Sequence, residues 1–588
     1  MKSLLCFLCG CLLFFPQMLL AQEHEQTVQD KNAYTALKVY PETSEGLPIR
    51  SVVILIHKEG KTYTLDAPEM DAFYKIASIY PGSVFNRSIT NMAIRRIDQD
   101  PRVSKVDYEL YSNNLTSPVV LVVNVYILNP GEHKVYAGSK GMIASKTGRD
   151  FPLLFENNKS ELTFILNGGV GLYNEVNPFF GQGKSFTQGN PIADDPGGKG
   201  VRFWGEAYLE PGIGGIVELG NSNIYTYGAI TGLFSGRNTA DIYSSGAAGY
   251  GALERLYAGF VFTQLGEKNL NLDISYGRQT FQLNDGFLLS KYSGSSNAGS
   301  RGSVYLNSRT SFNKAGLIKL NSSSWSLQGF YLEPQELSRH NKVHTTYAGG
   351  YLGYNNNKHW DVGFAYINRV RGSGSYSTVN GKIPQKGLYV LNPKIWINNI
   401  ANKGFFLKSE YAFEGHSDGD MRANAWYIGG GLDLKNVVTK PMFYYRYAFM
   451  QGQKEGSRYY TRFDPLLTGG LGDWVQGINM RKVLGNGNII SHRLQARFNP
   501  VSSVDVSVDY FHLRANSYIN LSGLAPITHL KSKHLGDEIT ITSHWYINQH
   551  FMLLGLASIA IPGNGLRESV TGGTRDWSSV QLALFMFF

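Results

Sequence analysis

Charged and apolar residues alternate along two neighbouring segments near the C-terminal end of the chain. In the first segment the polar positions are Ser491, Arg493, Gln495 and Arg497. In the second they are Asp505, Ser507 and Asp509. A turn at 499–503, folded about Val501, predicts the pairs Arg497–Asp505, Gln495–Ser507 and Arg493–Asp509. Opposite charges across an antiparallel pair are stabilising, and a polar ladder of this kind requires a wet surface rather than lipid.

Other charged residues occupy alternate positions in further segments and are candidates for the same wet surface. They are Asp361, Arg369, Lys408, Glu410, Glu414 and Arg446. Arginines and lysines without an acidic partner would attract an anionic solute. Alternatively, the charges neutralise one another and have no role in transport. The residue pattern leaves both interpretations open.

Sequence motifs for other chemistry are incomplete. Gly181–Ser185 looks like a phosphate loop, but the first glycine of that motif would fall at position 178, which is proline. The histidines show no metal-ligand spacing along the sequence, and no Ser-His-Asp set stands out. We therefore expect no cofactor, no metal and no enzymatic activity, with a barrel-embedded hydrolase as the enzymatic alternative.

The segments that carry these charges have the pattern of strands. From about Ser160 to Phe588, stretches of roughly ten residues alternate in polarity between turns rich in Gly, Asn and Ser. In 360–366, 442–449 and 537–547, large apolar residues share one face and polar or small residues the other. A soluble sandwich also alternates, but many such strands with aromatic residues at their ends favour a transmembrane β-barrel.

The length of this region sets the number of strands. Residues 160–588 comprise 429 positions, and a hairpin with a short turn and a longer loop needs roughly 45–50 residues. The expected fold is an all-β transmembrane barrel of about 18 antiparallel strands, with 16 as the alternative, preceded by a small α+β domain. A barrel of this size encloses an aqueous lumen.

The last strand ends on an aromatic C-terminal residue. Its alternate apolar positions are Val580, Leu582, Leu584, Met586 and Phe588. This pattern resembles the recognition signal that outer-membrane barrels present to the barrel assembly machinery. In a soluble protein the same segment would be an aggregation-prone edge. We therefore expect outer-membrane lipid and the assembly machinery as partners.

The first 21 residues have the composition of a secretory signal peptide. Lys2 precedes an apolar run from Leu4 to Leu20, and Ala21 precedes the expected cleavage site. The three cysteines of the chain, Cys6, Cys9 and Cys11, all lie in this segment. The mature chain would therefore hold no disulfide and no thiolate site. A membrane anchor and a lipoprotein signal are the alternatives.

Residues 22–47 are polar and are expected to be a linker, and residues 48–130 a small α+β domain. A strand at 51–57, helices opening at Asp66 and Asn86, and strands at 103–111 and 118–128 give the order β-α-α-β-β. This order resembles a POTRA domain, which implies a periplasmic location and a periplasmic protein partner bound by strand addition. A generic spacer domain is the alternative. Residues 131–159 would connect this domain to the barrel.

The basic excess of the chain belongs to its long C-terminal region. Residues 23–130 carry 13 acidic and 11 basic residues, whereas residues 131–588 carry 32 acidic and 43 basic residues. A positive region of this kind suits an anionic solute or polymer, or an anionic membrane surface. Nucleic acid is not an expected partner of an exported protein.

Several segments after residue 160 are similar, in order, to the alginate-export family of outer-membrane porins. They are Ser275–Gln279, Leu283–Leu288, Tyr331–Leu337, Tyr445–Ala448, Arg462–Leu467, Trp474–Gly477, Leu535–Glu538 and Ile561–Gly563. The resemblance implies an 18-stranded barrel whose arginine-lined constriction passes an anionic polysaccharide. It makes Arg278, Arg446 and Arg462 pore candidates. Because Arg278 shares parity with the apolar Ile274 and Tyr276, a bulge is required to turn it inward.

Together these features predict an outer-membrane channel of a Gram-negative bacterium, with its N-terminal domain in the periplasm. We expect selective passive passage of an anionic or sugar-like solute, and above all export of a polysaccharide through a basic pore. Pore radius and fixed charge would supply the selectivity. A small-solute uptake porin with the same barrel and a POTRA-dependent protein translocator are the alternatives.

Overall fold

A computed structural model describes most of the chain after residue 36. The described residues are 37–63, 73, 79–112, 117–129, 131–132, 142–143, 152–157, 159–187, 200–220, 222–266, 270–291, 302–322, 324–335, 344–356, 359–378, 381–434, 436–468, 473–501, 503–521, 523–548 and 550–588. The expected signal peptide lies outside them, as does the expected helix after Asp66 except for Phe73.

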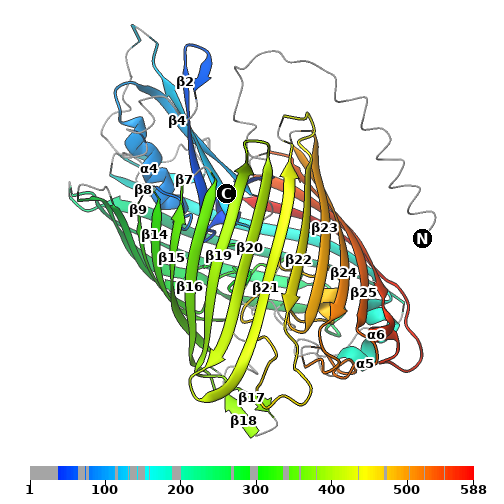
Figure 1. The fold of residues 1–588 in the computed structure, drawn as a ribbon. Helices are drawn as coiled ribbons and strands as arrows, with labels where there is room; N and C mark the ends of the chain where they lie inside the picture. The colour runs from blue at the N-terminus through cyan, green and yellow to red at the C-terminus, as the bar shows by residue number, and fades with distance from the viewer. Residues whose placement is uncertain are drawn as a thin grey trace.

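Eighteen strands form a closed antiparallel barrel (Figure 1). They are β8 (Ser160–Val176), β9 (Val201–Glu218), β10 (Ile224–Arg237), β11 (Ala248–Leu265), β12 (Leu270–Arg278), β13 (Lys314–Asn321), β14 (Trp325–Glu333), β15 (Thr346–Asn355), β16 (Trp360–Arg371), β19 (Leu388–Ile400), β20 (Phe405–His416), β21 (Gly419–Asp433), β22 (Met442–Met450), β23 (Ile489–Val501), β24 (Val504–Ala515), β25 (His534–Tyr546), β26 (Phe551–Pro562) and β27 (Trp577–Phe587). Each strand pairs with the next, and β27 closes the ring on β8. The predicted number of 18 is confirmed, and the alternative of 16 is wrong.

Short strands and helices lie at the edge of the barrel sheet and in its loops. β6 (Met142–Ile143) and β7 (Leu153–Glu156) extend the sheet beside β8, and β17 (Ser375–Thr378) pairs with β18 (Gly381–Pro384) in a small separate hairpin. Four short helices lie in the loops: η2 (Pro178–Gly181), α5 (Gly183–Thr187), η6 (Met480–Lys482) and α6 (Asn564–Arg567). Among the described residues, the helices are all too short or too polar to cross a membrane.

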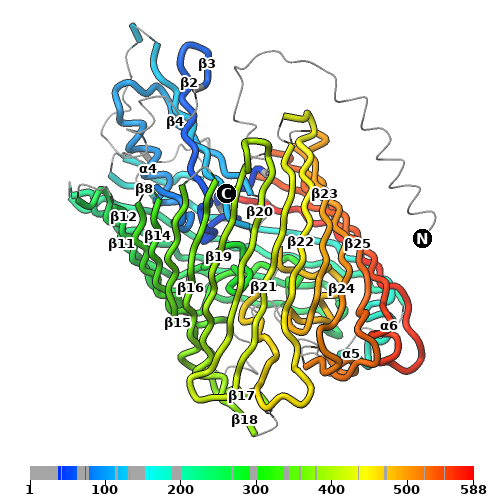
Figure 2. The backbone as a smooth tube through the Cα atoms, in the orientation of Figure 1, coloured from blue at the N-terminus to red at the C-terminus, as the bar shows by residue number. Residues whose placement is uncertain are grey.

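The two ends of the barrel differ. One end, here the short-turn end, carries brief connections such as 219–223, 322–324 and 547–550, together with the C-terminus. The other, the long-loop end, carries loops 279–313 and 451–488 together with β17, β18, α5 and α6. Figure 2 shows the N-terminal domain at the short-turn end, opposite these loops.

The outer face of the barrel is apolar, as the alternation predicts. On β27, Val580 and Leu582 point outward and are 55% and 48% exposed, whereas Ala583, which points inward, is 1% exposed. On β16 and β22 large aromatic residues such as Phe364 and Phe443 also point outward, while Asp361 and Arg446 are buried inside. A continuous apolar surface of this extent is stable in lipid and not in water.

The N-terminal domain is a five-stranded sheet with two described helices, of which α4 is the longer. Its elements are β1 (Leu37–Val39), α2 (Pro41–Ser44), β2 (Ile49–Lys58), β3 (Lys61–Tyr63), α4 (Arg87–Asp98), β4 (Val103–Ser112) and β5 (Val119–Ile127), in the sheet order β1-β4-β5-β2-β3. Asn86 caps α4 by accepting from the Ile89 N–H at 3.1 Å. Residues 37–44, expected as linker, instead form β1 and α2, because Val39 is buried in the sheet.

The lipid-facing position of the outer face leads to a stability prediction. Ile541 lies midway along β25, points outward and is 47% exposed. Replacing it by Arg would put a charge in hydrocarbon, so Ile541→Arg should lower the free energy of unfolding by about 2–4 kcal/mol. Denaturant unfolding in phospholipid vesicles, followed by tryptophan fluorescence, measures this loss. Ile541→Leu is the control, and an Arg variant as stable as that control would show that this face lies in water.

Candidate functional site: the barrel lumen

The predicted charge ladder lines the inner face of β23 and β24. Arg497 Nε lies 2.6 Å from Asp505 Oδ1, and Arg493 Nε lies 2.7 Å from Asp509 Oδ1. Gln495 donates to the same oxygen of Asp509 at 3.0 Å. The two ion pairs therefore form between the residues expected from the sequence, and their side chains are buried inside the barrel.

The backbone register of this hairpin differs from the prediction by two residues. Arg497 lies opposite Ser507 and Gln495 opposite Asp509, so the predicted register is wrong. The strands continue through the expected turn to a tight connection in which Val501 pairs with Val504, after an irregularity that begins at Phe498. The ion pairs consequently run along the diagonal between strands, a distance that arginine spans.

Arg446 and Arg493 lie directly opposite each other on β22 and β23. Two cations at this spacing repel, and Asp473 of loop 451–488 compensates them. Its carbonyl accepts from Arg446 Nη1 at 2.7 Å, and its carboxylate lies 3.2 Å from Arg493 Nη1. The guanidinium of Arg446 also lies 4.1 Å above the ring of Trp474, a cation–π contact. The loop therefore covers both arginines.

Loop 279–313 brings a second acid to the same place. Asp285 Oδ1 accepts from Trp474 Nε1 at 3.0 Å, and its other oxygen lies 3.3 Å from the Tyr427 hydroxyl. The same hydroxyl lies 3.1 Å from Glu410 Oε1 on β20. We call this group the constriction cluster and define it as Asp285, Glu410, Tyr427, Arg446, Asp473, Trp474 and Arg493. Two loops and four strands meet in it.

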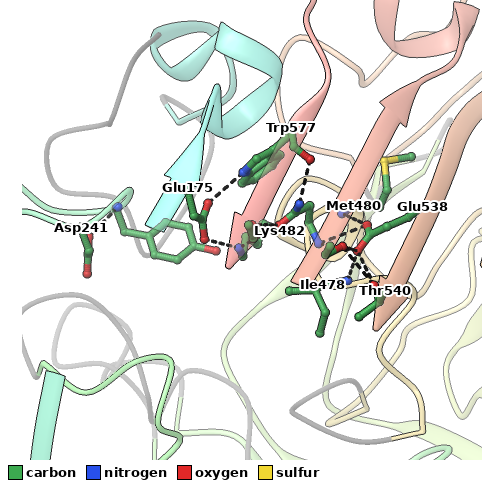
Figure 3. Close-up of polar contacts among 12 residues, drawn as sticks. Glu175, Asp241, Ile478, Met480, Lys482, Glu538, Thr540 and Trp577 are labelled. Atoms are coloured by element: carbon green, nitrogen blue, oxygen red, sulfur yellow. Dashed lines mark hydrogen bonds and ion pairs between the residues drawn. The ribbon is translucent and has the colours of Figure 1, made fainter. Parts of the chain in front are cut away.

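Loop 451–488 is fixed to the barrel wall at two points (Figure 3). The carboxylate of Glu538 on β25 accepts from the backbone N–H groups of Ile478–Met480. Lys482 Nζ lies 2.5 Å from Glu175 Oε1 on β8, and Trp577 Nε1 donates to the other oxygen of Glu175 at 2.8 Å. Charge-assisted bonds of this kind are short and strong. They hold the loop inside the lumen, with its acid beside the arginines.

Three further predicted residues line the lumen around the constriction cluster. Lys408 on β20 is buried, with its ammonium 4.8 Å above the ring of Trp396. Arg369 on β16 donates to Thr345 Oγ1 at 2.9 Å and lies 4.0 Å from Asp464 of loop 451–488. Arg462 belongs to that loop rather than to a strand. Lys408 borders the constriction cluster, because its charge acts on Asp285 and Asp473. Arg369 and Arg462 instead contact Asp464 and Tyr460 of loop 451–488.

Arg278 lies at the end of β12, where the alternation breaks. Gly277 has φ +137, a conformation that L side chains rarely adopt. The pairing with β11 runs unbroken through Arg278, so the expected bulge is absent from this end of β12. The arginine is half-buried, and its Nη1 donates to Asn313 Oδ1 at 2.7 Å. It also lies within electrostatic range of the buried Glu254.

The N-terminal domain enters the short-turn end of the barrel. The carbonyl of Gly82 accepts from Ser326 Oγ at 3.1 Å, and that of Arg50 accepts from Asn355 Nδ2 at 2.6 Å. Ser117 reaches further and donates to the Asp473 carboxylate at 2.7 Å. One cavity between domain and wall, next to Arg50 and Gln328, has a volume of about 30 Å³, room for a water or two. A larger one of about 350 Å³ lies between α4 and β7–β8. The domain thus contacts a loop that enters from the opposite end.

Further contacts surround this domain on other strands. Tyr40 packs against Tyr546 and Phe587, with ring centroids 5.5 and 5.3 Å apart. Arg95 on α4 lies 2.9 Å from Glu156 and also pairs with Glu161 of β8. Strands from distant parts of the ring therefore contact the domain, which occupies the short-turn end of the lumen.

Sequence reasoning missed Asp285, Asp473 and Trp474. They lie in loops, where strand alternation gives no information about which residues point inward. A signal did exist, because the family-like segments Leu283–Leu288 and Trp474–Gly477 contain all but Asp473. The contact of Ser117 with Asp473 joins residues 356 positions apart and left no trace in local patterns.

The chain was compared with known proteins. A family model described as alginate export matches residues 244–576. No curated protein sequence matches the chain. Among solved structures, Pseudomonas aeruginosa OccK5 (OpdH) and OccK9 (OpdG) are each 10% identical, with a TM-score of 0.44, covering 73% of this chain and 98% of theirs. Salmonella typhi OmpF, solved in complex with daunomycin, is 11% identical with a TM-score of 0.36, covering 73% of this chain and 98% of its own.

The ion pairs of Asp473 lead to a pH prediction. Burial raises the pKa of Asp473, but the charges of Arg493, Lys408 and Arg446 together lower it to about 2. The carboxylate of Asp473 therefore compensates the charge of the arginines fully above the ordinary carboxyl pKa. This compensation is lost as the pH falls to about 2, where the carboxylate takes up a proton. Bilayer recordings should show steady anion preference down to about pH 4 and an increase below it.

The variant Asp473→Asn should show the increased anion preference already at pH 7, because the arginines lose their compensating charge. Asp418→Asn, in an exposed turn of the long-loop end, is the control and should behave as the unmodified channel. Equal selectivity of the two variants would contradict this role of Asp473.

Proposed function

Because the chain belongs to the alginate export family, we propose that its barrel exports an anionic polysaccharide across the outer membrane. The observation that carries this proposal is the pair of opposed arginines, Arg446 and Arg493, under the acid of a loop. When the loop moves aside, two buried cations face the lumen, and fixed cations in a narrow pore favour anions. No covalent step is needed for such passage.

Aromatic rings beside the arginines support a sugar-like solute. Trp396 and Trp474 are buried, and Lys408 and Arg446 lie over their rings. The ring of Tyr427 packs 4.7 Å from that of Trp474. Rings of this kind offer an apolar face with a polar edge. Alternating cations and rings therefore suit a chain of acidic sugars, whose rings are apolar on their faces and whose carboxylates are charged.

The proposed orientation follows from the two ends of the barrel. Outer-membrane barrels have short periplasmic turns and longer extracellular loops. By this rule the short-turn end and the POTRA-like N-terminal domain lie in the periplasm, after removal of the signal peptide. The strand ending at Phe588 would be recognised there by the assembly machinery.

We further propose that the N-terminal domain is the gate of the channel. It occupies the short-turn end and touches the constriction through Ser117, so a polysaccharide cannot pass while it is docked. Withdrawal of the domain, with movement of loop 451–488, would open the path. A periplasmic partner that binds an edge of its sheet by strand addition would favour the withdrawn state.

The proposed selectivity predicts the effect of neutralising the arginines. Arg446→Gln and Arg493→Gln each keep a hydrogen-bond donor but remove a lumen charge, so the anion-to-cation permeability ratio should fall. Reversal potentials under a salt gradient in planar bilayers measure this ratio. Arg371→Gln, at an exposed position on β16, is the control. Cation selectivity of the unmodified channel would exclude export of an anion.

The proposed gate predicts an opening mutation. A Cβ on Gly82 would lie 2.5 Å from Ser326 Cβ, so Gly82→Ala must push the domain away from the wall. A clash of about 1–3 kcal/mol shifts the docked-to-withdrawn equilibrium by about 5- to 150-fold. The open probability in bilayer recordings should rise accordingly.

The control for this experiment is Gly60→Ala. Gly60 has φ +73, close to the φ +85 of Gly82, but no atom lies within 4 Å of its Cβ position. It therefore carries the same backbone strain without the clash, and its open probability should not change. Equal effects of the two variants would show that the domain does not gate the barrel.

A further inference from the structure

Three metal-ligating side chains meet on the outer face of the barrel, away from the lumen. His512 Nδ1 lies 2.8 Å from Asp537 Oδ1, and His534 Nε2 lies 3.0 Å from Asp537 Oδ2. His512 belongs to β24 and the other two to β25, near the long-loop end of both strands. The neighbours Phe511, Leu513 and Glu538 are buried on the inner side, so the three side chains point outward.

A β-bulge brings His534 into this group. In a regular strand, residues 534 and 537 would face opposite sides of the sheet. Here Leu513 pairs with Gly536 and Arg514 with His534, which leaves Leu535 as an extra residue. Gly536, at φ +152, permits this irregular backbone. Bulges often re-aim a side chain at a functional site, and this one turns His534 to the outer face beside Asp537.

The chemistry of the group suits a divalent transition metal. One ligand atom from each of His512, His534 and Asp537 lies within 4.8 Å of the other two. Two imidazole nitrogens and one carboxylate oxygen are a donor set that zinc accepts, with a fourth position left to water. The side chains are 25–38% exposed. His534 is the first residue of β25 at the long-loop end, where the outer face leaves the bilayer, so an ion can reach them. Tyr510 donates to Asp537 Oδ1 at 2.7 Å and orients the carboxylate, as outer-shell partners of metal ligands do.

We propose that His512, His534 and Asp537 form a zinc site that ties β24 to β25 on the outer face of the barrel. The site is separate from the proposed pore and does not depend on what the pore transports. The spacing of the histidines along the sequence gave no sign of it, because His512 and His534 are joined only through strand pairing and the bulge.

The test is zinc binding by the full chain, purified in detergent without a polyhistidine tag. Competition with a chromophoric chelator should show one bound zinc ion per chain. Cobalt in place of zinc should give the visible absorption of a four-coordinate site, and zinc should raise the melting temperature. Absence of stoichiometric binding would overturn the proposal.

Four variants distinguish the site from adventitious binding. His534→Ala and Asp537→Asn should abolish stoichiometric binding, while Tyr510→Phe should weaken it about 10- to 100-fold through loss of the orienting bond. His492→Ala is the matched control. His492 also lies outward, with its ring 6.0 Å from that of His512, but its Nδ1 faces the Tyr445 hydroxyl at 2.8 Å.

The control should bind zinc as the unmodified chain does. Melting in the absence of metal verifies that every variant is folded. Binding that survives in both His534→Ala and Asp537→Asn, or that is lost equally in His492→Ala, would refute the assignment.

Discussion

The absence of water in the bilayer core is the constraint on which this structure depends. Backbone N–H and C=O groups find no solvent partner there, so a sheet that crosses must close on itself. The pairing of β27 with β8 achieves this closure. Once the sheet is closed, each strand has one face in lipid and one in the lumen, and the alternation of residues decides which charges lie inside. The polar ladder of β23 and β24 is a consequence of that closure.

Closure of the barrel also brings like charges close together in the lumen. Arg446 and Arg493 face each other across two strands and would repel without compensation. Loop 451–488 compensates this repulsion, because it places Asp473 beside both arginines. The carboxylates of Glu175 and Glu538 hold the loop in this position. Loop and wall are therefore one electrostatic unit, in which the same residues set the width of the lumen and its net charge.

The sequence predicted what repeats along the chain. The strand alternation, the number of strands and the inward position of Arg446 follow from a period of two and from length. The features that the sequence did not predict depend on three-dimensional geometry, which the periodicity of residue types does not encode. The register predicted for the β23–β24 hairpin was wrong because the strands continue through the expected turn as far as Val501. The inward loop residue Asp473, the docking of the N-terminal domain and the bulge at Gly536 depend on contacts between distant segments.

The interface between the N-terminal domain and the barrel combines apolar and polar contacts. Ile89 and Met92 of α4 pack against Ile216, Tyr225 and Val261 of the barrel wall, whereas other contacts bury charged groups. The polar contacts include Ser117, the buried Glu45, whose backbone carbonyl accepts from Thr280, and Lys291, which donates to the carbonyl of Thr43. Burial raises the pKa of Glu45 and, together with Arg255, lowers that of Lys291 to about 7, so both groups are more stable as ions when exposed to water. The cost of keeping these groups dry favours release, and the many hydrogen bonds oppose it. A domain balanced in this way can be withdrawn by a partner that binds only its free form.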